Sequence, residues 1–307
     1  MQLKPRERGS PARKGVLHKS LLLCGSLSLV LLLGAQSGWT KSKLDDISKI
    51  GKRNVAGRSI ISQEKENAIG GFYARQLEAR VNLIADVAVN QYVDRVAQNI
   101  GRNSDLKIPL TVKVIESSEP DVLILPGGYV YVNSGWIQFV DDEAQLAGAL
   151  AYGIARLATR QWAEQMTKQV ILQYAMVPLI NTPQSFGVFY GIMHQSPGGA
   201  PPGFLKFNRE AVVEADYLGV QYLYKTGYDP HSYVTLLGKI AKIEDAHASQ
   251  PPKIFRDRPP AQERIAACEK EIKKILPARN QGAVASAEFA DIQARLKTLS
   301  GTKPADY

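Results

Sequence analysis

Few residues in this chain could hold a metal ion or act as a nucleophile. The histidines downstream of residue 37 are His194, His231 and His247. No two of them stand at a spacing that lets both side chains bind one metal. The acidic pair Glu244-Asp245 beside His247 is more typical of a solvated helix end than of a metal site. Cys268 has no second cysteine downstream of residue 37 with which to form a disulfide or a zinc site. No Gly-x-Ser-x-Gly turn or phosphate-binding loop occurs.

The first 37 residues have the pattern of a targeting segment. A basic region ends at Lys19, an apolar run extends over 21–33, and small residues stand at Ala35 and Ser37, where a signal peptidase prefers them. The run is shorter than the ~20 residues of a membrane span. We therefore expect a signal peptide over 1–37, with an uncleaved anchor and inner-membrane association as the alternative. Both place the protein outside the cytoplasm, in the periplasm or on the extracytoplasmic face of the membrane.

The composition is that of a soluble globular protein. The 307 residues are 45% hydrophobic and 22% charged, which excludes a disordered or fibrous chain. The net charge is +9, but the first 37 residues carry much of the excess. The remaining Lys and Arg are scattered rather than clustered on one face, so the sequence gives no indication of a nucleic acid partner.

The first half of the chain predicts a helical region followed by a small sheet. Apolar residues recur at helical spacing over 69–100, and Gly101 is a typical helix stop. Alternating β-branched residues predict a strand over 110–115. A short second strand is expected over 121–124, and a third segment over 129–132 after the turn Leu125-Pro126-Gly127-Gly128.

The second half predicts helices separated by one long loop. Asp141-Asp142-Glu143 is suited to the start of a helix from 143 to about 169. Residues 177–206 are rich in Pro, Gly and Phe and indicate a loop or flap. Further helices are expected over 208–225, 231–246, 262–275 and 289–299. The fold class is α+β and mostly helical. We expect a polar lead-in over 38–66, one domain over 67–276 and a tail with a short helix over 277–307.

Four blocks occur in a recognisable order with suitable gaps. They are Leu125–Gly135, Glu143–Ala151, Glu214–Val220 and Gly227–Pro230. Over roughly Ile69 to Arg264 the chain resembles the gluzincin zinc metallopeptidases of the HtpX, BepA and CAAX prenyl protease family, peptidase family forty-eight. The resemblance implies a metallopeptidase-like domain with a small β-sheet and an active-site helix pair.

The motif that carries catalysis in this family is altered here. Family members have His-Glu-x-x-His on the first helix, where two imidazoles one turn apart bind zinc and the glutamate activates water. Tyr152, Gly153 and Arg156 replace the first histidine, the glutamate and the second histidine. Val212 stands where the second helix should supply a glutamate ligand, and Gln161 where many relatives carry a further histidine.

These replacements remove the chemistry that zinc requires. Phenol is a poor ligand at neutral pH, valine has no donor atom, and guanidinium repels a cation. Arg258-Pro259 also stands where the family often has His-Pro. We therefore expect no metal site, no cofactor where the family would hold zinc, and no peptidase activity.

Two features of the altered site suggest what it retains. Asp216 corresponds to the family residue that orients a ligand histidine. We expect Arg156 to enter the vacated pocket and pair with Asp216 or Glu214, the alternative being a solvated Arg156. The substrate-binding edge strand of the family corresponds to Leu125, Pro126, Gly127, Gly128, Tyr129 and Val130. This strand could still bind an extended peptide, which needs no zinc, or could be kept for folding alone.

The sequence therefore predicts a catalytically inactive, metallopeptidase-like protein of the cell envelope. Its expected partner is an extended peptide or an unfolded envelope protein, which it would bind as a scaffold, a chaperone-like factor or a regulator. The alternatives are an active zinc-dependent metalloendopeptidase of envelope protein quality control and a regulator that dimerises with an active relative.

Overall fold

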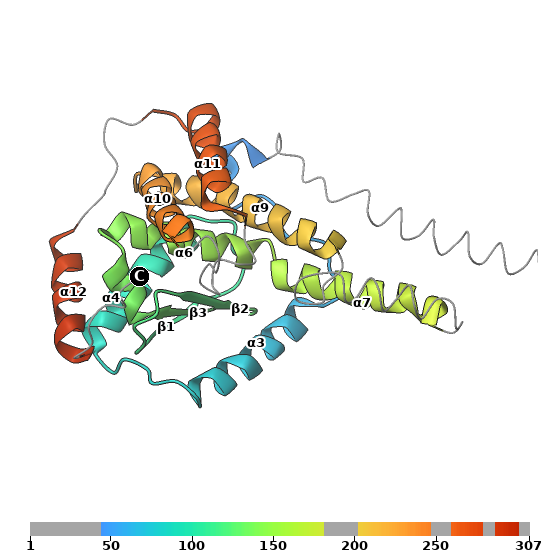
Figure 1. The fold of residues 1–307 in the computed structure, drawn as a ribbon, viewed down its shortest axis with the longest axis horizontal. Coiled ribbons are helices and arrows are strands. Elements are labelled where there is room, and N and C mark those ends of the chain that lie inside the picture. Colours follow the sequence, from blue (N-terminus) through green and yellow to red (C-terminus); the bar gives the residue numbers. More distant parts are fainter. Residues whose placement is uncertain (1–43, 181–201, 247–258, 279–285, 301–307) are drawn as a thin grey trace, which may run out of the picture.

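The computed structural model describes residues 44–180, 202–246, 259–278 and 286–300. Residues 1–37, most of the expected loop over 177–206, and Arg258 lie outside the described residues. The elements in chain order are η1 (Ile47–Lys49), α3 (Gln63–Glu78), α4 (Val87–Arg102), β1 (Thr111–Ile115), β2 (Val122–Leu125), β3 (Tyr129–Asn133), α5 (Ser134–Phe139), α6 (Glu143–Ala158), α7 (Gln161–Ile180), α9 (Pro202–Thr226), α10 (His231–Ala246), α11 (Ala261–Ile275) and α12 (Ala287–Ser300). The mostly helical α+β class is confirmed (Figure 1).

The three predicted strands form one mixed sheet in the order β1-β3-β2. The central strand β3 runs parallel to β1 and antiparallel to β2. Gly127 and Gly128 connect β2 to β3 with φ angles of 79° and 94°. These left-handed conformations favour glycine, which explains the Leu-Pro-Gly-Gly turn. β2 is thus an edge strand.

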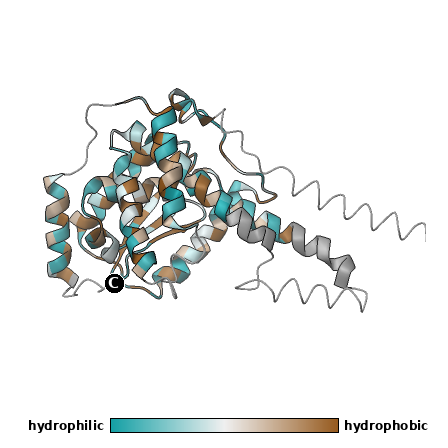
Figure 2. Ribbon diagram, turned by 45° about the horizontal axis from the view of Figure 1, so that its top comes forward, coloured by the Kyte–Doolittle hydropathy of each residue, from teal (hydrophilic) through white to brown (hydrophobic). Residues whose placement is uncertain are grey.

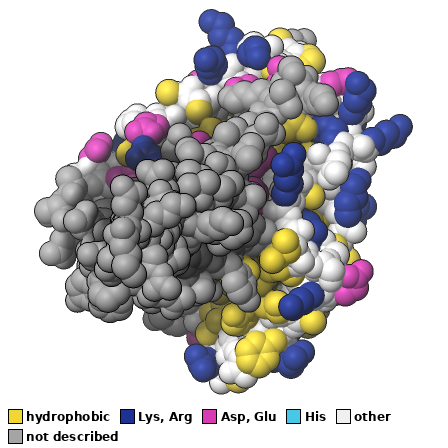
Figure 3. All heavy atoms as spheres, turned by 90° about the vertical axis from the view of Figure 1, so that its right-hand side faces the viewer, with side chains coloured by type: hydrophobic (Ala, Val, Ile, Leu, Met, Phe, Trp, Pro, Cys, Tyr) yellow, Lys and Arg dark blue, Asp and Glu magenta, His cyan; other side chains and the backbone are white. Residues whose placement is uncertain are grey.

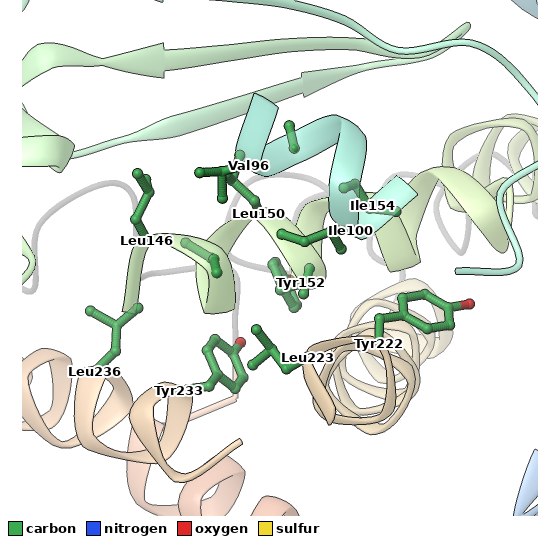
Figure 4. Packing of buried hydrophobic residues seen from close by; sticks show 14 of the residues in the cluster. Val96, Ile100, Leu146, Leu150, Tyr152, Ile154, Tyr222, Leu223, Tyr233 and Leu236 are labelled. Atoms are coloured by element: carbon green, nitrogen blue, oxygen red, sulfur yellow. The ribbon is translucent and has the colours of Figure 1, made fainter. Parts of the chain in front are cut away.

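Helix α6 lies at the centre of the helical layer. Every residue of α6 except Glu143 and Arg156 is buried, because α4, α9 and α10 pack around it. Gly219 of α9 permits the close approach of one neighbour, since a Cβ there would lie 3.2 Å from the backbone nitrogen of Tyr152. Figure 4 shows the resulting core, with residues of α4, α6, α9 and α10 meeting in one cluster.

Two predicted helical stretches are each divided in the structure. The stretch over 69–100 belongs to α3 and α4, and Asp86 begins α4 by accepting the N–H of Val89. The helix expected from 143 to about 169 ends at Ala158, and α7 begins at Gln161. Arg160 between them has φ 53° and donates to the carboxylate of Glu66 over 2.7 Å. That contact joins residues 94 positions apart, so local periodicity could not reveal it.

The segment before α3 belongs partly to the core. Leu44, Ile50 and Val55 are buried in the main cluster. Arg53 forms a buried ion pair with Asp105 at 2.5 Å. The polar lead-in expected over 38–66 is therefore anchored to the domain from residue 44 onward.

The outer helices present mixed faces. Figure 2 shows hydrophilic and hydrophobic residues alternating along them, as expected for helices that bury one side. Helix α12 buries Phe289, Ile292 and Leu296. Within the described residues, no helix combines the length and the apolar character needed to cross a bilayer.

Candidate functional site

A small, partly open cavity of about 30 Å³ lies beside the edge strand. Its walls come from β2, α5, α6, α10 and α11. The side chains that matter for its chemistry are Asp121, Ile124, Trp136, Tyr152, Gly153, Arg156, Tyr233 and Arg264. Three of the four altered motif positions, 152, 153 and 156, therefore face one space, as the helical spacing predicts.

Tyr152 is enclosed by aromatic and cationic groups. Its ring stacks on that of Tyr233, with centroids 6.4 Å apart and planes inclined by 21°. The guanidinium carbons of Arg264 and Arg156 lie 5.1 and 5.9 Å from its centroid. Figure 4 shows Tyr152 of α6 and Tyr233 of α10 lying toward each other. The ring of Tyr152 thus packs against one aromatic ring and within cation–π distance of two guanidinium groups.

Gly153 and Val212 offer nothing to a metal or to a water molecule. A Cβ at Gly153 would lie 2.6 Å from Cδ1 of Ile124. Ile124 therefore occupies the space that a larger side chain at 153 would need. Val212 is buried in the apolar cluster.

Asp216 and Arg264 form the buried ion pair of the site. Arg264 Nε donates to Oδ2 and its Nη2 to Oδ1, both at 2.8 Å. The hydroxyl of Tyr233 donates to the same carboxylate over 2.7 Å. Burial has the largest single effect and lowers the pKa of Arg264, but the charges of Asp216 and Tyr233 and the hydrogen bonds to Asp216 together raise this pKa well above its usual value. The guanidinium therefore remains charged, bidentate and fixed.

The expected pairing of Arg156 with Asp216 is wrong, because Arg264 already takes that carboxylate. Arg156 is half-buried and its Nε donates to Oε1 of Gln161 over 3.1 Å. Gln161 in turn donates to the backbone oxygen of Ala211, which ties α7 to α9. Arg156 is therefore held at the cavity by a neutral side chain and by the ring of Tyr152.

Residues 86–272 match the sequence profile of peptidase family M48. This chain belongs to peptidase family M48. The resemblance inferred from the sequence blocks is thereby confirmed, and the helical domain with its small sheet is the M48 peptidase-like fold.

Similar proteins include several named proteases. The chain is 25% identical to the beta-barrel assembly-enhancing protease of Yersinia pestis over 271 residues, covering 85% of this chain and 53% of that protein. The protein of that name from Escherichia coli K12 is 24% identical over 243 residues, covering 76% and 49%. The mitochondrial metalloendopeptidase OMA1 of Schizosaccharomyces pombe is 29% identical over 182 residues, covering 53% and 50%. The chain thus spans about half the length of the curated relatives it matches.

The residues of this M48 member do not fit a zinc ion. Tyr152, Gly153, Arg156 and Val212 supply neither imidazole nor carboxylate, and two guanidinium groups adjoin the same space. Among the described residues, no group of three or more His, Cys, Asp or Glu side chains could hold a metal. No catalytic step through zinc can be derived from this arrangement.

The second expected partner of Arg156 lies elsewhere. Glu214 is two residues from Asp216 on α9, and such positions do not share a helix face. Burial and then the charge of Glu164 raise the pKa of Glu214 to about 7, while Lys168 opposes this shift. Glu214 is therefore under the electrostatic influence of Glu164 and Lys168 of α7, and the expected pairing of Arg156 with it does not form among the described residues.

The expected peptide-binding strand is also displaced. Leu125 ends β2, Pro126, Gly127 and Gly128 form the turn, and Tyr129 and Val130 belong to β3. β3 is hydrogen-bonded on both sides, so Tyr129 and Val130 cannot receive another strand. The edge available to a peptide is that of β2, over Val122–Leu125. The sequence did not show whether β2 or β3 would be the central strand, because both segments consist of similar apolar residues.

The hydrogen bonds between β2 and β3 determine which backbone groups of β2 point outward from the sheet. The N–H of Asn133 donates to the oxygen of Asp121 over 3.0 Å. Antiparallel alternation therefore directs the N–H and C=O of Val122 and Ile124 away from β3. The carboxylate of Asp121 takes the N–H of Val122 over 2.7 Å. Ile124 thus presents the edge group nearest Gly153 of α6.

A second hollow, the α3–α7 groove, has about 370 Å³ and lies on another face. It is lined by Lys65, Ala68, Ile69, Phe72, Tyr73, Trp162 and Met166. Figure 3 shows hydrophobic side chains gathered on the lower part of this face, with Lys and Arg around them. Lys65 is the one charged residue among the described lining, so the groove offers an apolar surface but no acid–base pair.

Proposed function

We propose that this chain is a non-catalytic member of family M48 that binds extended peptides or unfolded proteins in the cell envelope. The observation that carries this proposal is that Tyr152, Gly153 and Arg156 at the cavity, and Val212 in the apolar cluster, supply neither a zinc donor nor a general base. An arginine–aspartate pair and a tyrosine stack occupy the surroundings instead. Hydrolysis needs an activated water, and no side chain at position 153 can activate one.

Peptide binding depends on groups that this chain retains. The open edge of β2 can pair with an extended segment through the N–H and C=O of Ile124. The same edge adjoins the cavity, so a bound peptide would pass over Gly153 without meeting a nucleophile. Capture without cleavage is the activity of a scaffold or a chaperone-like factor.

The envelope assignment has two supports. The N-terminal 37 residues have the pattern of an export signal. Two of the relatives are named for enhancing beta-barrel assembly. Because the match covers about half of those proteins, their substrates and partners are transferred here as a proposal only.

A casein experiment tests capture against cleavage. Residues 38–307 are incubated with reduced, carboxymethylated casein, which is an unfolded substrate, and the bound and intact fractions are measured. The proposal expects retention of intact casein. Ile124→Pro removes the outward N–H and should reduce retention at least about fivefold, since proline is tolerated at a strand edge but cannot donate. Ile124→Val keeps the N–H and serves as the matched control.

Two results of this experiment would contradict the proposal. Retention that Ile124→Pro leaves unchanged would exclude the β2 edge. Casein fragments that disappear on chelation would favour the second candidate, an active zinc-dependent metalloendopeptidase. That candidate has one support, the names of the relatives, which are protease and metalloendopeptidase.

A further inference from the structure

We propose that the cavity beside β2 is a carboxylate-binding site, in which Arg156 and Trp136 take the carboxylate of a peptide that lies along the edge strand. The inference rests on the proposed function, because it requires a cavity without zinc. It adds the chemical class of the ligand, which edge pairing alone leaves open.

Arg156 brings a positive charge to the cavity and forms no ion pair with any described residue. Its Nε is taken by Gln161, and no described residue accepts a hydrogen bond from its two Nη nitrogens. Its guanidinium carbon lies 5.9 Å from the centroid of the Tyr152 ring. A planar guanidinium with a free pair of donors is suited to a carboxylate, which can bind it in a bidentate manner.

Trp136 supplies an independent indication that a ligand is expected. Its side chain lines the same cavity and is 6% exposed. Its buried Nε1 has no hydrogen-bond partner among the described residues. A buried donor without a partner costs free energy comparable to a lost hydrogen bond, so a native structure usually satisfies it. A ligand acceptor within hydrogen-bond reach of Nε1 would satisfy it, and Trp136 is part of the cavity wall.

Arg264 adds positive charge near the cavity, but the carboxylates of Asp216 and Asp121 leave little net attraction for a carboxylate ligand. Its Nε and Nη2 are committed to Asp216, while no described residue accepts from Nη1. Asp121 lines the cavity from the side of β2 with the opposite charge, although its Oδ1 accepts the N–H of Val122. A lone carboxylate should therefore bind weakly. A peptide that also pairs with β2 should bind more tightly, since the two contacts act together.

The size of the cavity limits what can enter. About 30 Å³ has room for roughly two water-sized groups. The two oxygens of a carboxylate fit this space, whereas a phosphate or a whole side chain does not. Both the C-terminus of a peptide and an internal Glu or Asp side chain carry this group, so the test must separate these sources.

The indole resonance of Trp136 gives a direct readout. The chain has three tryptophans, so ¹⁵N-labelled protein shows few indole signals, and Trp136→Phe assigns the relevant one. Sodium acetate is titrated at constant ionic strength, and acetamide of nearly equal shape is the neutral control. We expect a saturable shift of the Trp136 signal with acetate only, while the signal of Trp162 in the α3–α7 groove does not move.

Charge variants test the role of Arg156. Arg156→Gln should weaken acetate binding at least about tenfold, because a charge-assisted hydrogen bond is lost. Arg102→Gln, an exposed arginine on α4, should have no effect. The proposal is overturned if acetate does not shift the signal, if acetamide shifts it equally, or if Arg156→Gln binds acetate as the unaltered protein does.

Three acetylated pentapeptides identify the source of the carboxylate. One has a free C-terminus, one is amidated, and one is amidated with a central glutamate. Tighter binding of the first indicates a C-terminal carboxylate, and tighter binding of the third an acidic side chain. Equal binding of all three overturns the proposal.

Zinc is measured in the same samples. This measurement separates a failure of the proposed function from a failure of the carboxylate site. Stoichiometric zinc would refute the proposed function together with this site. Zinc-free protein without an acetate response would refute the carboxylate site alone.

Discussion

At the scale of single residues, the altered site is held by the ion pair between Asp216 and Arg264. Both side chains are almost fully buried, at 1% and 3% exposure. Breaking one half of such a pair leaves an uncompensated charge in the interior, which costs much more than losing a surface pair. The pair therefore contributes to holding the helices α9 and α11 together beside the cavity.

Arg264→Met should lower the free energy of unfolding by about 3–5 kcal/mol, because Asp216 would remain buried without its partner. Urea unfolding monitored by circular dichroism measures this change. Arg209→Gln is the matched control, since Arg209 and Glu263 form an exposed pair at 52% and 60% exposure. Its effect should stay below about 1 kcal/mol. Equal effects of the two substitutions would show that the buried pair has no special role.

The raised pKa of Glu214 predicts that the stability of the protein depends on pH. The folded state raises its pKa from the ordinary 4.5 to about 7. Between these values the unfolded chain has already released a proton that the folded chain keeps, so stability falls as the pH rises through this window. Full ionisation should cost of the order of 3 kcal/mol.

Glu214→Gln should therefore stabilise the protein at pH 8 by about 1–3 kcal/mol and leave it unchanged at pH 4. Denaturant unfolding at both pH values measures this, with the exposed Glu116→Gln as control. A variant that is no more stable than the unaltered protein at pH 8 would place the titration elsewhere.

The sequence was sufficient to find the altered positions but not their new contacts. Tyr152, Gly153 and Arg156 stand in a recognisable block, and helical spacing brings them to one space. The partner of Asp216, however, lies 48 residues further along the chain. Only the packing of α11 against α9 shows that Arg264, and not Arg156, reaches the carboxylate. Nothing in the sequence indicated that the indole of Trp136 would lack a hydrogen-bond partner among the described residues.

At the scale of elements, helix α3 fixes the turn that leads into β3. A Cβ at Gly70 would lie 1.8 Å from the backbone oxygen of Pro126. Gly127 approaches the same helix, since a Cβ there would lie 2.9 Å from Cα of Asn67. The glycines therefore permit a close contact between α3 and the β2–β3 turn.

Gly70→Ala should destabilise the protein by about 1–3 kcal/mol, although alanine favours a helix, because the backbone of Pro126 cannot yield as a side chain would. Gly238→Ala in α10 is the matched control, since no atom of the described residues lies within 4 Å of its added Cβ. It should stabilise by roughly 0.5–1 kcal/mol. Thermal unfolding of both variants tests this contrast, and a stabilised Gly70→Ala would mean that α3 packs less closely.

Element types were predictable, whereas boundaries and strand order were not. The periodicity of residues 231–246 gave α10 with its bounds as observed. The break at Arg160 depends on Glu66, which lies far away in the sequence. The central place of β3 depends on its parallel pairing with β1, and alternation within one segment contains no information about neighbours.

At the scale of the whole molecule, membership of family M48 accounts for the arrangement of helices around α6. Four short blocks in the right order were enough to predict it. The anchoring of residues 44–55 was not predictable, because Arg53 and Asp105 stand 52 positions apart in stretches that look polar. The chain thus has the family fold, while Tyr152, Gly153, Arg156 and Val212 supply neither imidazole nor carboxylate.

Metal analysis tests the central claim most directly. Residues 38–307 are purified without chelator, exposed to equimolar zinc, dialysed and measured by mass spectrometry of the metal. The described site predicts zinc far below one ion per chain and no change after treatment with a chelator. One tightly held zinc per chain, lost when Arg156 or Tyr152 is substituted, would contradict the account.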